Sequence, residues 1–297
     1  MLTVLAPAKI NLTLEVLAKR QDGFHEIRSL IQTINLCDSL HFQLSQNIEF
    51  NADQPNWIPG KSLVSKAASL LQEVTGCGKG ATIEVSKRIP LLSGLGGDSS
   101  DAAATLRGLN KLWGLGLSQG ELLELASQLS SDVAFFLYGG TALVKGRGEM
   151  VTPLPPLPCM QVVLMMPPVP RMPGKTERLY ANLKASHYTG GQTTDRLVAR
   201  LTRGREVIPS LLFNVFGDVA RDSFAGLEEY WERFLKAGAK EVHLAGSGPA
   251  LFTLMKDKAQ AEDLYIRLQQ QGLESYLAET LAAIDKLGEK PIIGEIV

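Results

Sequence analysis

Cysteine is scarce in this sequence: there are three, at positions 37, 77 and 159, in no ligand pattern. Such few and distant cysteines provide neither a disulfide framework nor a zinc site, and they fit a reduced cytoplasm. Long apolar runs are missing too, since none approaches the roughly 18 residues of a membrane span. The first residues reach Pro7 and Lys9 without a secretory hydrophobic region. We therefore expect a cytoplasmic protein with no membrane partner.

An excess of charge of one sign is also absent. The 297 residues carry a formal net charge of −1, without a long block of like charge. This argues against a general nucleic-acid binder, and an anionic ligand would need a local cluster of cations. The content of 45% hydrophobic and 21% charged residues is that of a globular enzyme-like chain. We expect a monomer or a weak homodimer.

The hydrophobic patterning predicts an α+β protein of two domains, residues 1–152 and 153–297, because strands and helices mix without strict alternation. The boundary is placed at the proline-dense stretch 153–158. A capping box at Ser118 and Glu121 predicts one helix start, and residues 10–17 read as a half-buried strand. The other expected strands are 29–35, 40–44, 82–86, 141–145, 162–166, 241–245, 251–255 and 274–279. The expected helices are 62–74, which Gly76 would end, 99–113, 119–129, 130–137, 176–185, 218–235 and 258–271. The polar, proline-broken residues 51–60 are expected to be a loop.

The most informative stretch is the glycine-rich loop at residues 87–100 (KRIPLLSGLGGDSS). It follows a predicted strand and precedes an alanine-rich helix whose N-cap would be Ser99 or Ser100. Bare amides ahead of a helix N-terminus favour a phosphate site, although an ordinary glycine turn before a helix has the same pattern.

Two rival interpretations of the glycine motifs fail. Residues 174–176 (GKT) and 60–62 (GKS) end like a P-loop, but the first glycine of that motif is replaced by Val169 and Pro55. The loop at 94–99 also lacks the third glycine and the βαβ context of a dinucleotide fingerprint.

Three further features each have a structural and a functional interpretation. Lys9 at a strand entry is either a solvated end residue or a fixed cation for a phosphate or a developing alkoxide. Asp132 either caps its helix or accepts a hydroxyl proton. Residues 246–249 (GSGP) are a plain hairpin or a second anion nest, while Phe24 and His25 lie at the edge of a turn.

Three motifs in fixed order resemble those of the GHMP kinases, which include galactokinase and the homoserine, mevalonate and phosphomevalonate kinases. They are residues 7–12 (PAKINL), 90–104 (PLLSGLGGDSSDAAA) and 246–252 (GSGPALF). Residues 22–25 (DGFH) and 131–136 (SDVAFF) are most similar to the members that phosphorylate a cytidine-diphosphate-linked sugar alcohol in non-mevalonate isoprenoid biosynthesis. The resemblance spans nearly the whole chain and implies a C-terminal domain of ferredoxin-like α+β type.

The same resemblance implies the site residues, with ATP and Mg²⁺ as cosubstrate and cofactor. Asp132 would be the catalytic base, and Lys9 would polarise the acceptor hydroxyl. The implied ATP-binding residues are Ser62, Lys87, Pro90, Leu91, Leu92, Ser93, Gly94, Leu95, Gly96, Gly97, Asp98, Ser99 and Ser100, with Ser99 or Ser100 near the metal. The implied substrate-binding residues are Asn11, Phe24, His25, Thr176, Tyr180, Gly246 and Ser247; Phe24 and Tyr180 would sandwich the cytosine.

The chain departs from the family pattern at four positions. Phe24 replaces a usual tyrosine, Asp98 a small residue, Ala134 a frequent proline, and Ser62 an asparagine that often faces the adenine. A carboxylate at Asp98 must point away from the phosphates or act through magnesium. A kinase for homoserine or mevalonate, or a ligand sensor of the same fold without catalysis, are the alternatives; the presence of both Lys9 and Asp132 favours an enzyme.

Overall fold

The computed structural model describes residues 1–55, 57–170 and 174–283. These residues form two β-sheets, one of seven strands and one of four. The larger sheet has the order β3-β4-β2-β1-β8, and β5 pairs with both β2 and β6. Its strands are β1 (Leu2–Lys19), β2 (His25–Ser45), β3 (Ile48–Ala52), β4 (Gly80–Ser86), β5 (Thr141–Gly146), β6 (Met150–Pro153) and β8 (Phe213–Asn214). Among the described residues, no helix is long and apolar enough to cross a membrane.

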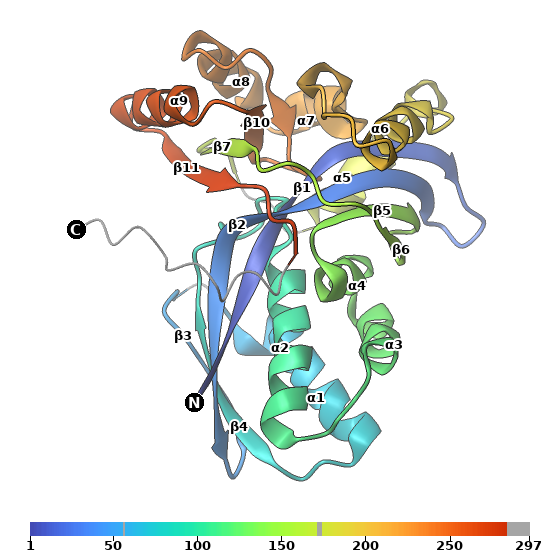
Figure 1. Cartoon of the computed structure of the whole chain (residues 1–297), viewed down its shortest axis with the longest axis vertical. Helices are drawn as coiled ribbons and strands as arrows, with labels where there is room; N and C mark the ends of the chain where they lie inside the picture. The colour runs from blue at the N-terminus through green and yellow to red at the C-terminus, as the bar shows by residue number, and fades with distance from the viewer. Residues whose placement is uncertain (56, 171–173, 284–297) are drawn as a thin grey trace.

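Four helices cover the lower part of this sheet on one face (Figure 1). They are α1 (Leu63–Thr75), α2 (Gly97–Trp113), α3 (Gln119–Leu129) and α4 (Ser131–Tyr138). The predicted capping box is confirmed, because the Ser118 hydroxyl accepts from Glu121 N while Ser118 N donates to the Glu121 carboxylate. Gly76 ends α1 in the left-handed conformation, as its sequence position predicts.

The second sheet has the antiparallel order β11-β7-β10-β9, formed by β7 (Gln161–Met166), β9 (His243–Leu244), β10 (Leu251–Met255) and β11 (Glu274–Glu279). Helices α7 (Phe216–Ser223), α8 (Leu227–Lys236) and α9 (Lys258–Gln270) lie beside it at the top of the molecule (Figure 1). Numbered by chain position, the strand order is 4-1-3-2, which is the ferredoxin-like arrangement. The α+β prediction is confirmed.

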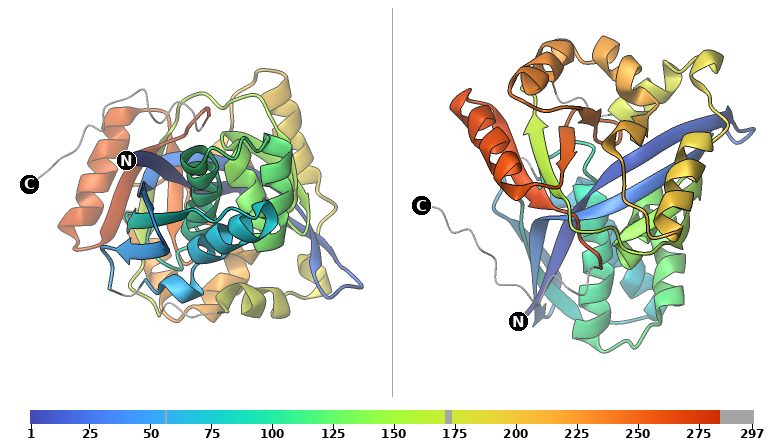
Figure 2. Two further views of the ribbon diagram at one scale, coloured as in Figure 1. Left: turned by 90° about the horizontal axis from the view of Figure 1, so that it is seen from below. Right: turned by 45° about the horizontal axis from the view of Figure 1, so that its top comes forward.

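Strand β1 differs from the prediction of a half-buried strand at 10–17. It runs continuously from Leu2 to Lys19, and residues 6–16 are buried on both faces, including Lys9 and Thr13. One face meets α2, and the other meets α6 (Gln192–Thr202) and the second sheet, so alternation of polar and apolar residues does not mark a solvent side. Figure 2 shows the β1–β2 ribbon extending from one half of the molecule into the other.

Three predicted helix boundaries need correction. Helix α2 begins at Gly97, with Gly96 as its N-cap, so Ser99 and Ser100 lie within the first turn. The predicted helix 218–235 is two helices, because Gly226 adopts a φ of 86° between them. Helix α5 (Lys175–Ala181) ends at Ala181, with Asn182 as its C-cap, rather than at 185. The remaining short helical turns are η1 (Pro59–Lys61), η2 (Ala185–His187) and η3 (Pro209–Leu211).

The boundary between residues 152 and 153 remains a prediction, and residues 284–297 of the second predicted domain lie outside the described residues. Strand β6 ends in the larger sheet at Pro153, and β7 enters the smaller sheet at Gln161. The later strand β8 nevertheless returns to the larger sheet, where Phe213 pairs with Thr13.

Candidate active site

The glycine-rich loop joins β4 to α2 and packs directly against the turn at residues 245–248. Gly94 has a φ of 93°, and a Cβ placed on it would lie 2.1 Å from the Ala245 carbonyl oxygen and 2.8 Å from Gly248 N. Ala250 N donates to the Ser93 carbonyl at 3.0 Å, which joins the same two segments. The backbone of the loop therefore contacts the backbone of the turn directly, and no residue with a side chain fits at Gly94.

The start of α2 opens toward the cleft. Gly96 has a φ of 76°, and a Cβ on it would meet the Phe136 ring at 2.8 Å. The amides of the first helical turn have no partner within the helix and carry its positive end, which suits an anion. The structure thus has the bare, rigid loop and helix start that a phosphate site needs.

Lys9 lies beside this loop on β1. Its backbone N donates to the Leu95 carbonyl at 2.9 Å, and its Nζ donates to Asn11 Oδ1 at 2.6 Å. Asn11 Nδ2 in turn donates to the Ser29 hydroxyl at 2.8 Å, which fixes the amide. Burial lowers the pKa of Lys9, and the charge of Asp132 opposes that shift. Lys9 is a buried, oriented cation rather than a solvated strand end.

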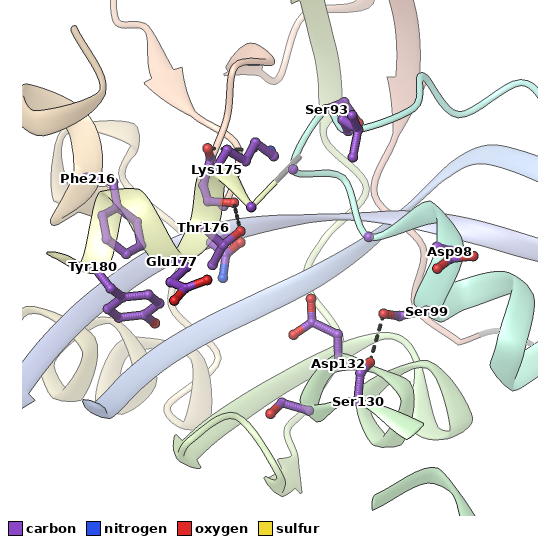
Figure 3. Close-up of a pocket in the computed structure, with 18 of the residues that line it drawn as sticks. Ser93, Asp98, Ser99, Ser130, Asp132, Lys175, Thr176, Glu177, Tyr180 and Phe216 are labelled. Carbon is purple, nitrogen blue, oxygen red and sulfur yellow. Dashed lines mark hydrogen bonds between the residues drawn. The ribbon is translucent and has the colours of Figure 1, made fainter. Parts of the chain in front are cut away.

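Asp132 occupies the first turn of α4 and faces the cleft from the wall opposite Thr176 and Lys175 (Figure 3). The N-cap of this helix is Ser130, whose hydroxyl lies 3.1 Å from that of Ser99. The charge of Asp132 acts on both Lys9 and Tyr180. Burial lowers the pKa of Lys9, and Asp132 opposes that shift. Burial raises the pKa of Tyr180, and Asp132 adds to that shift. This position favours the functional interpretation of Asp132 over a capping role.

Asp98 points away from the loop, toward α1. Its two carboxylate oxygens accept from Leu63 N at 3.1 and 3.2 Å, next to Ser62, which is the N-cap of α1 and accepts from Ser65 N. Burial raises the pKa of Asp98, although the Leu63 amide and the nearby Lys87 and Lys66 oppose the shift. Asp98 therefore fastens the start of α1 to the start of α2.

Replacement of Asp98 by alanine is expected to lower the free energy of unfolding by about 1 kcal/mol, because Leu63 N at the helix start loses its acceptor. Asp98→Asn keeps an acceptor oxygen for Leu63 N, so it is expected to match the wild-type stability at pH 7. Urea unfolding of both variants measures the difference. Equal stability of Asp98→Ala and wild type would show that the bond to α1 contributes nothing.

Lys87 belongs to the wall of the cleft, and its side chain is buried between two carboxylates. Its Nζ lies 2.5 Å from Asp38 and 2.6 Å from Asp101, and its side chain is 1% exposed. Asp38 also accepts from Arg88 N and Ile89 N, at the start of the loop. Burial lowers the pKa of Lys87, but the two carboxylates together outweigh it and raise that pKa above its usual value. Burial raises the pKa of Asp101. Contact between Lys87 and a nucleotide remains a prediction.

The turn at residues 245–248 brings a third segment to Lys9. A Cβ on Gly246 would lie 2.9 Å from Lys9 Nζ and 2.7 Å from the Gly94 carbonyl. Asn214 Nδ2 donates to the Leu244 and Gly246 carbonyls, which supports the turn from outside. The hydroxyls of Ser247 and Thr176 lie 2.8 Å apart.

The far end of the cleft is aromatic. His25 stacks on Tyr180 with ring centres 4.7 Å apart and an interplanar angle of 22°, and Tyr180 meets Phe216 edge to face. Phe24 is 53% exposed, and the Arg147 guanidinium lies 4.8 Å from its ring centre. The predicted sandwich by Phe24 and Tyr180 remains a prediction, and His25 covers one face of Tyr180 in this structure.

One cavity of about 1700 Å³ connects these features. It brings together most of the residues predicted from the sequence: Lys9, Asn11, Phe24, His25, Ser62, Lys87, Pro90, Leu91, Leu92, Ser93, Gly94, Gly96, Gly97, Asp98, Ser99, Asp132, Thr176, Tyr180, Gly246 and Ser247. Leu95 and Ser100 do not line it. Leu95 is buried in the core, and the Ser100 hydroxyl donates to the Pro7 carbonyl at 2.7 Å.

Sequence reasoning missed several lining residues, chiefly Trp57, Arg147 and Lys175. Trp57 lies in a stretch assigned only as a loop, and Arg147 in a glycine-flanked turn. Lys175 belongs to the GKT triplet that fails as a P-loop; its position directly before Thr176, a predicted substrate residue, was the available signal.

Among the residues that the structure describes, no group of three or more His, Cys, Asp or Glu side chains could hold a metal ion. A magnesium ion that keeps several waters and phosphate ligands needs only one or two protein ligands. Of the two predicted serines, only Ser99 lines the cleft, so its hydroxyl is the candidate ligand.

Comparison with known proteins agrees with this geometry. Residues 62–140 match the model of the GHMP kinases N terminal domain and residues 201–273 that of the GHMP kinases C terminal domain. A 4-diphosphocytidyl-2-C-methyl-D-erythritol kinase of Dehalococcoides mccartyi (strain 195) is 50% identical over 96% of this chain and 100% of its own length. The enzyme of that name from Geobacillus thermodenitrificans is 38% identical over 97% of the chain and 98% of its own length.

Solved structures give the same result. The crystal structure of a 4-(cytidine 5'-diphospho)-2C-methyl-D-erythritol kinase has a TM-score of 0.79 at 30% identity, over 94% of this chain and 99% of that one. A homoserine kinase from Cytophaga hutchinsonii shares the fold, with a TM-score of 0.70 at 21% identity over 95% of this chain and 94% of that one. The chain therefore belongs to the GHMP kinase family, in its group of 4-diphosphocytidyl-2-C-methyl-D-erythritol kinases.

Proposed function

We propose that the protein transfers the γ-phosphoryl group of ATP to the 2-hydroxyl of 4-diphosphocytidyl-2-C-methyl-D-erythritol, giving the 2-phosphate and ADP in non-mevalonate isoprenoid precursor biosynthesis. The observation that carries the proposal is the meeting of Lys9, Asp132 and the glycine-rich loop in one cleft that also has an aromatic end. Such an arrangement supplies the positioning and charge stabilisation that phosphoryl transfer requires.

In the proposed step, the acceptor oxygen forms a bond to the γ-phosphorus while the bond from that phosphorus to the β–γ bridging oxygen breaks. The hydroxyl proton passes to the Asp132 carboxylate, and ADP carries away the bonding electron pair. Lys9, which Asn11 holds in place at 2.6 Å, stabilises the charge that develops on the acceptor oxygen.

ATP would bind with its phosphates on the loop and the first turn of α2, from Ser93 to Ser99. Mg²⁺, when bound, would offset the phosphate charge, with the Ser99 hydroxyl as its protein ligand. Ser62, the half-buried Leu91 and the exposed Leu92 would border the base at the outer end of the cleft.

The acceptor would bind on the other side of Lys9, toward the aromatic end. Stacking of a base on an aromatic ring contributes roughly 1–3 kcal/mol, and Phe24, His25 and Tyr180 supply rings there. Thr176, Gly246 and Ser247 would contact the part of the acceptor between its base and its hydroxyl. This group of rings favours an acceptor with a nucleotide part over homoserine or mevalonate, which have no base.

ADP release from ATP, measured with each acceptor in turn, tests the substrate. Turnover is expected with the cytidine compound, and at least 100-fold less kcat/KM with homoserine or mevalonate, because neither can stack on the rings. Turnover with either small alcohol but not with the cytidine compound would overturn the assignment. ATP binding without turnover of any acceptor would favour a ligand sensor.

A further inference from the structure

Lys175 is a second lysine at the point where the proposed reactants meet. It is the first residue of α5, its side chain is buried, and its Nζ lies 3.5 Å from the Ser247 carbonyl. The neighbouring Thr176 contacts the Ser247 hydroxyl, so the start of α5 is tied to the turn that also approaches Lys9. Figure 3 shows Lys175 and Thr176 on the wall of the cleft that Asp132 faces.

The charge of Lys175 is not neutralised by the protein. Within residues 1–55, 57–170 and 174–283, no carboxylate forms an ion pair with it, in contrast to Lys87 with its two aspartates. Burial, together with the charge of Lys9, lowers the pKa of Lys175 to about 7. A buried lysine without a counter-charge destabilises the free protein, and an anionic ligand would relieve this.

The charged groups around it agree with that interpretation. From β1 comes Lys9, a like charge; from α4 comes Asp132, which acts on Lys9; α5 itself adds Glu177 at the cleft. The turn at 246–249 brings no titratable side chain. Lys9 and Lys175 therefore share this space with two carboxylates, Asp132 and Glu177. Among the described residues neither carboxylate forms an ion pair with Lys175, so a ligand of negative charge can neutralise it.

Resting on the proposed function, we propose that Lys175 is a further catalytic residue that binds phosphate oxygens of the reactants beside Lys9. It is largely neutral in the free protein at pH 8 and takes up a proton when those oxygens bind. The oxygens belong either to the transferred phosphoryl group or to the diphosphate of the acceptor, and the experiment below distinguishes the two.

The kinetic test compares Lys175→Met, Lys175→Arg and a control, Lys240→Met, at an exposed lysine outside the cavity. Loss of a charged hydrogen bond of about 1.5–3 kcal/mol corresponds to a fall in kcat/KM of roughly 10- to 100-fold for Lys175→Met. In wild type, kcat/KM is expected to fall as the pH rises through about 7; in Lys175→Arg, which keeps its proton, this fall is expected to disappear. Equal kcat/KM of Lys175→Met and Lys240→Met, with wild type active on the cytidine compound, would overturn the role of Lys175 but not the proposed function.

Stability separates this role from a structural one. The pKa of Lys175 is lower in the folded than in the unfolded chain. Below pH 7 the folded protein must bury the charged lysine, so the destabilisation is largest there. It decreases as the pH rises toward 10.5, the ordinary pKa of a lysine. Lys175→Met is therefore expected to raise the thermal midpoint at pH 6.5 while it lowers activity. A structural lysine would give a lower midpoint with the loss of activity.

Proton uptake supplies a readout that does not need turnover. Calorimetric titrations at pH 8, in two buffers of different ionisation enthalpy, are made with a non-hydrolysable ATP analogue in one arm and the cytidine acceptor in the other. Uptake approaching one proton is expected in one arm and absent in Lys175→Met; that arm identifies the source of the oxygens. No uptake in either arm, or equal uptake in Lys175→Met, would overturn the proposal even if the enzyme is active.

Discussion

Replacement of Asp132 by asparagine is expected to lower kcat by about 10²- to 10⁴-fold, the usual contribution of a positioned general base. The amide has nearly the same shape, so KM for both reactants is expected to change less than threefold. The substitution also removes the carboxylate whose charge raises the pKa of Lys9 against the effect of burial. Steady-state ADP release measures the effect.

The matched control is Asp222→Asn, the same change at an exposed position on α7. It is expected to keep kcat within twofold. If Asp132→Asn retained more than a tenth of the wild-type kcat, Asp132 would be removed from the proton transfer. A loss seen only as a higher KM would instead make Asp132 a binding residue.

Replacement of Gly94 by alanine is expected to lower the free energy of unfolding by about 2–4 kcal/mol, through left-handed backbone strain and overpacking. The new Cβ would overlap the Ala245 carbonyl oxygen, 2.1 Å away, and the backbone φ of 93° disfavours any side chain. Separation of the loop from the turn at 245–248 would also move the phosphate amides, so ATP affinity is expected to fall at least tenfold. Urea unfolding and calorimetric ATP titration measure these effects.

Gly217→Ala on α7 is the control, because a Cβ there meets nothing within 4 Å and the backbone is not left-handed. It is expected to be neutral or to stabilise by up to about 1 kcal/mol, as alanine does in a helix. Unchanged stability and ATP binding in Gly94→Ala would mean that the two segments separate without cost.

Local chemistry made part of the structure predictable. The capping box at Ser118, the glycine stop at Gly76 and the glycine-rich loop before α2 depend on neighbours within a few residues. The single helix predicted at 218–235 was wrong, because apolar spacing continues across Gly226 although the left-handed backbone at that residue separates the two helices.

Interactions between distant segments could not be predicted. Asp38 and Lys87 meet across 49 positions, and Asp98 reaches Leu63 across 35, with no sequence pattern that marks either pair. The buried polar face of β1 was missed for the same reason, since its cover comes from helices and strands far along the chain. The family resemblance predicted most of the cleft lining, but not Lys175, whose importance depends on its burial in the same cleft as Lys9.

Strand β1 packs against elements from both sides of the proline-dense stretch at residues 153–158, and this would affect a protein divided there. Ile10 and Leu12 on this strand belong to one apolar cluster with Val162, Leu212 and Phe252, from beyond the proline-dense stretch. Fragments separated there would each expose half of a continuous apolar surface. They would have to reassociate to bury it, and only the reassembled pair would contain both Lys9 and Lys175. A split version of this protein is therefore a natural reporter of fragment complementation, with catalysis as its signal.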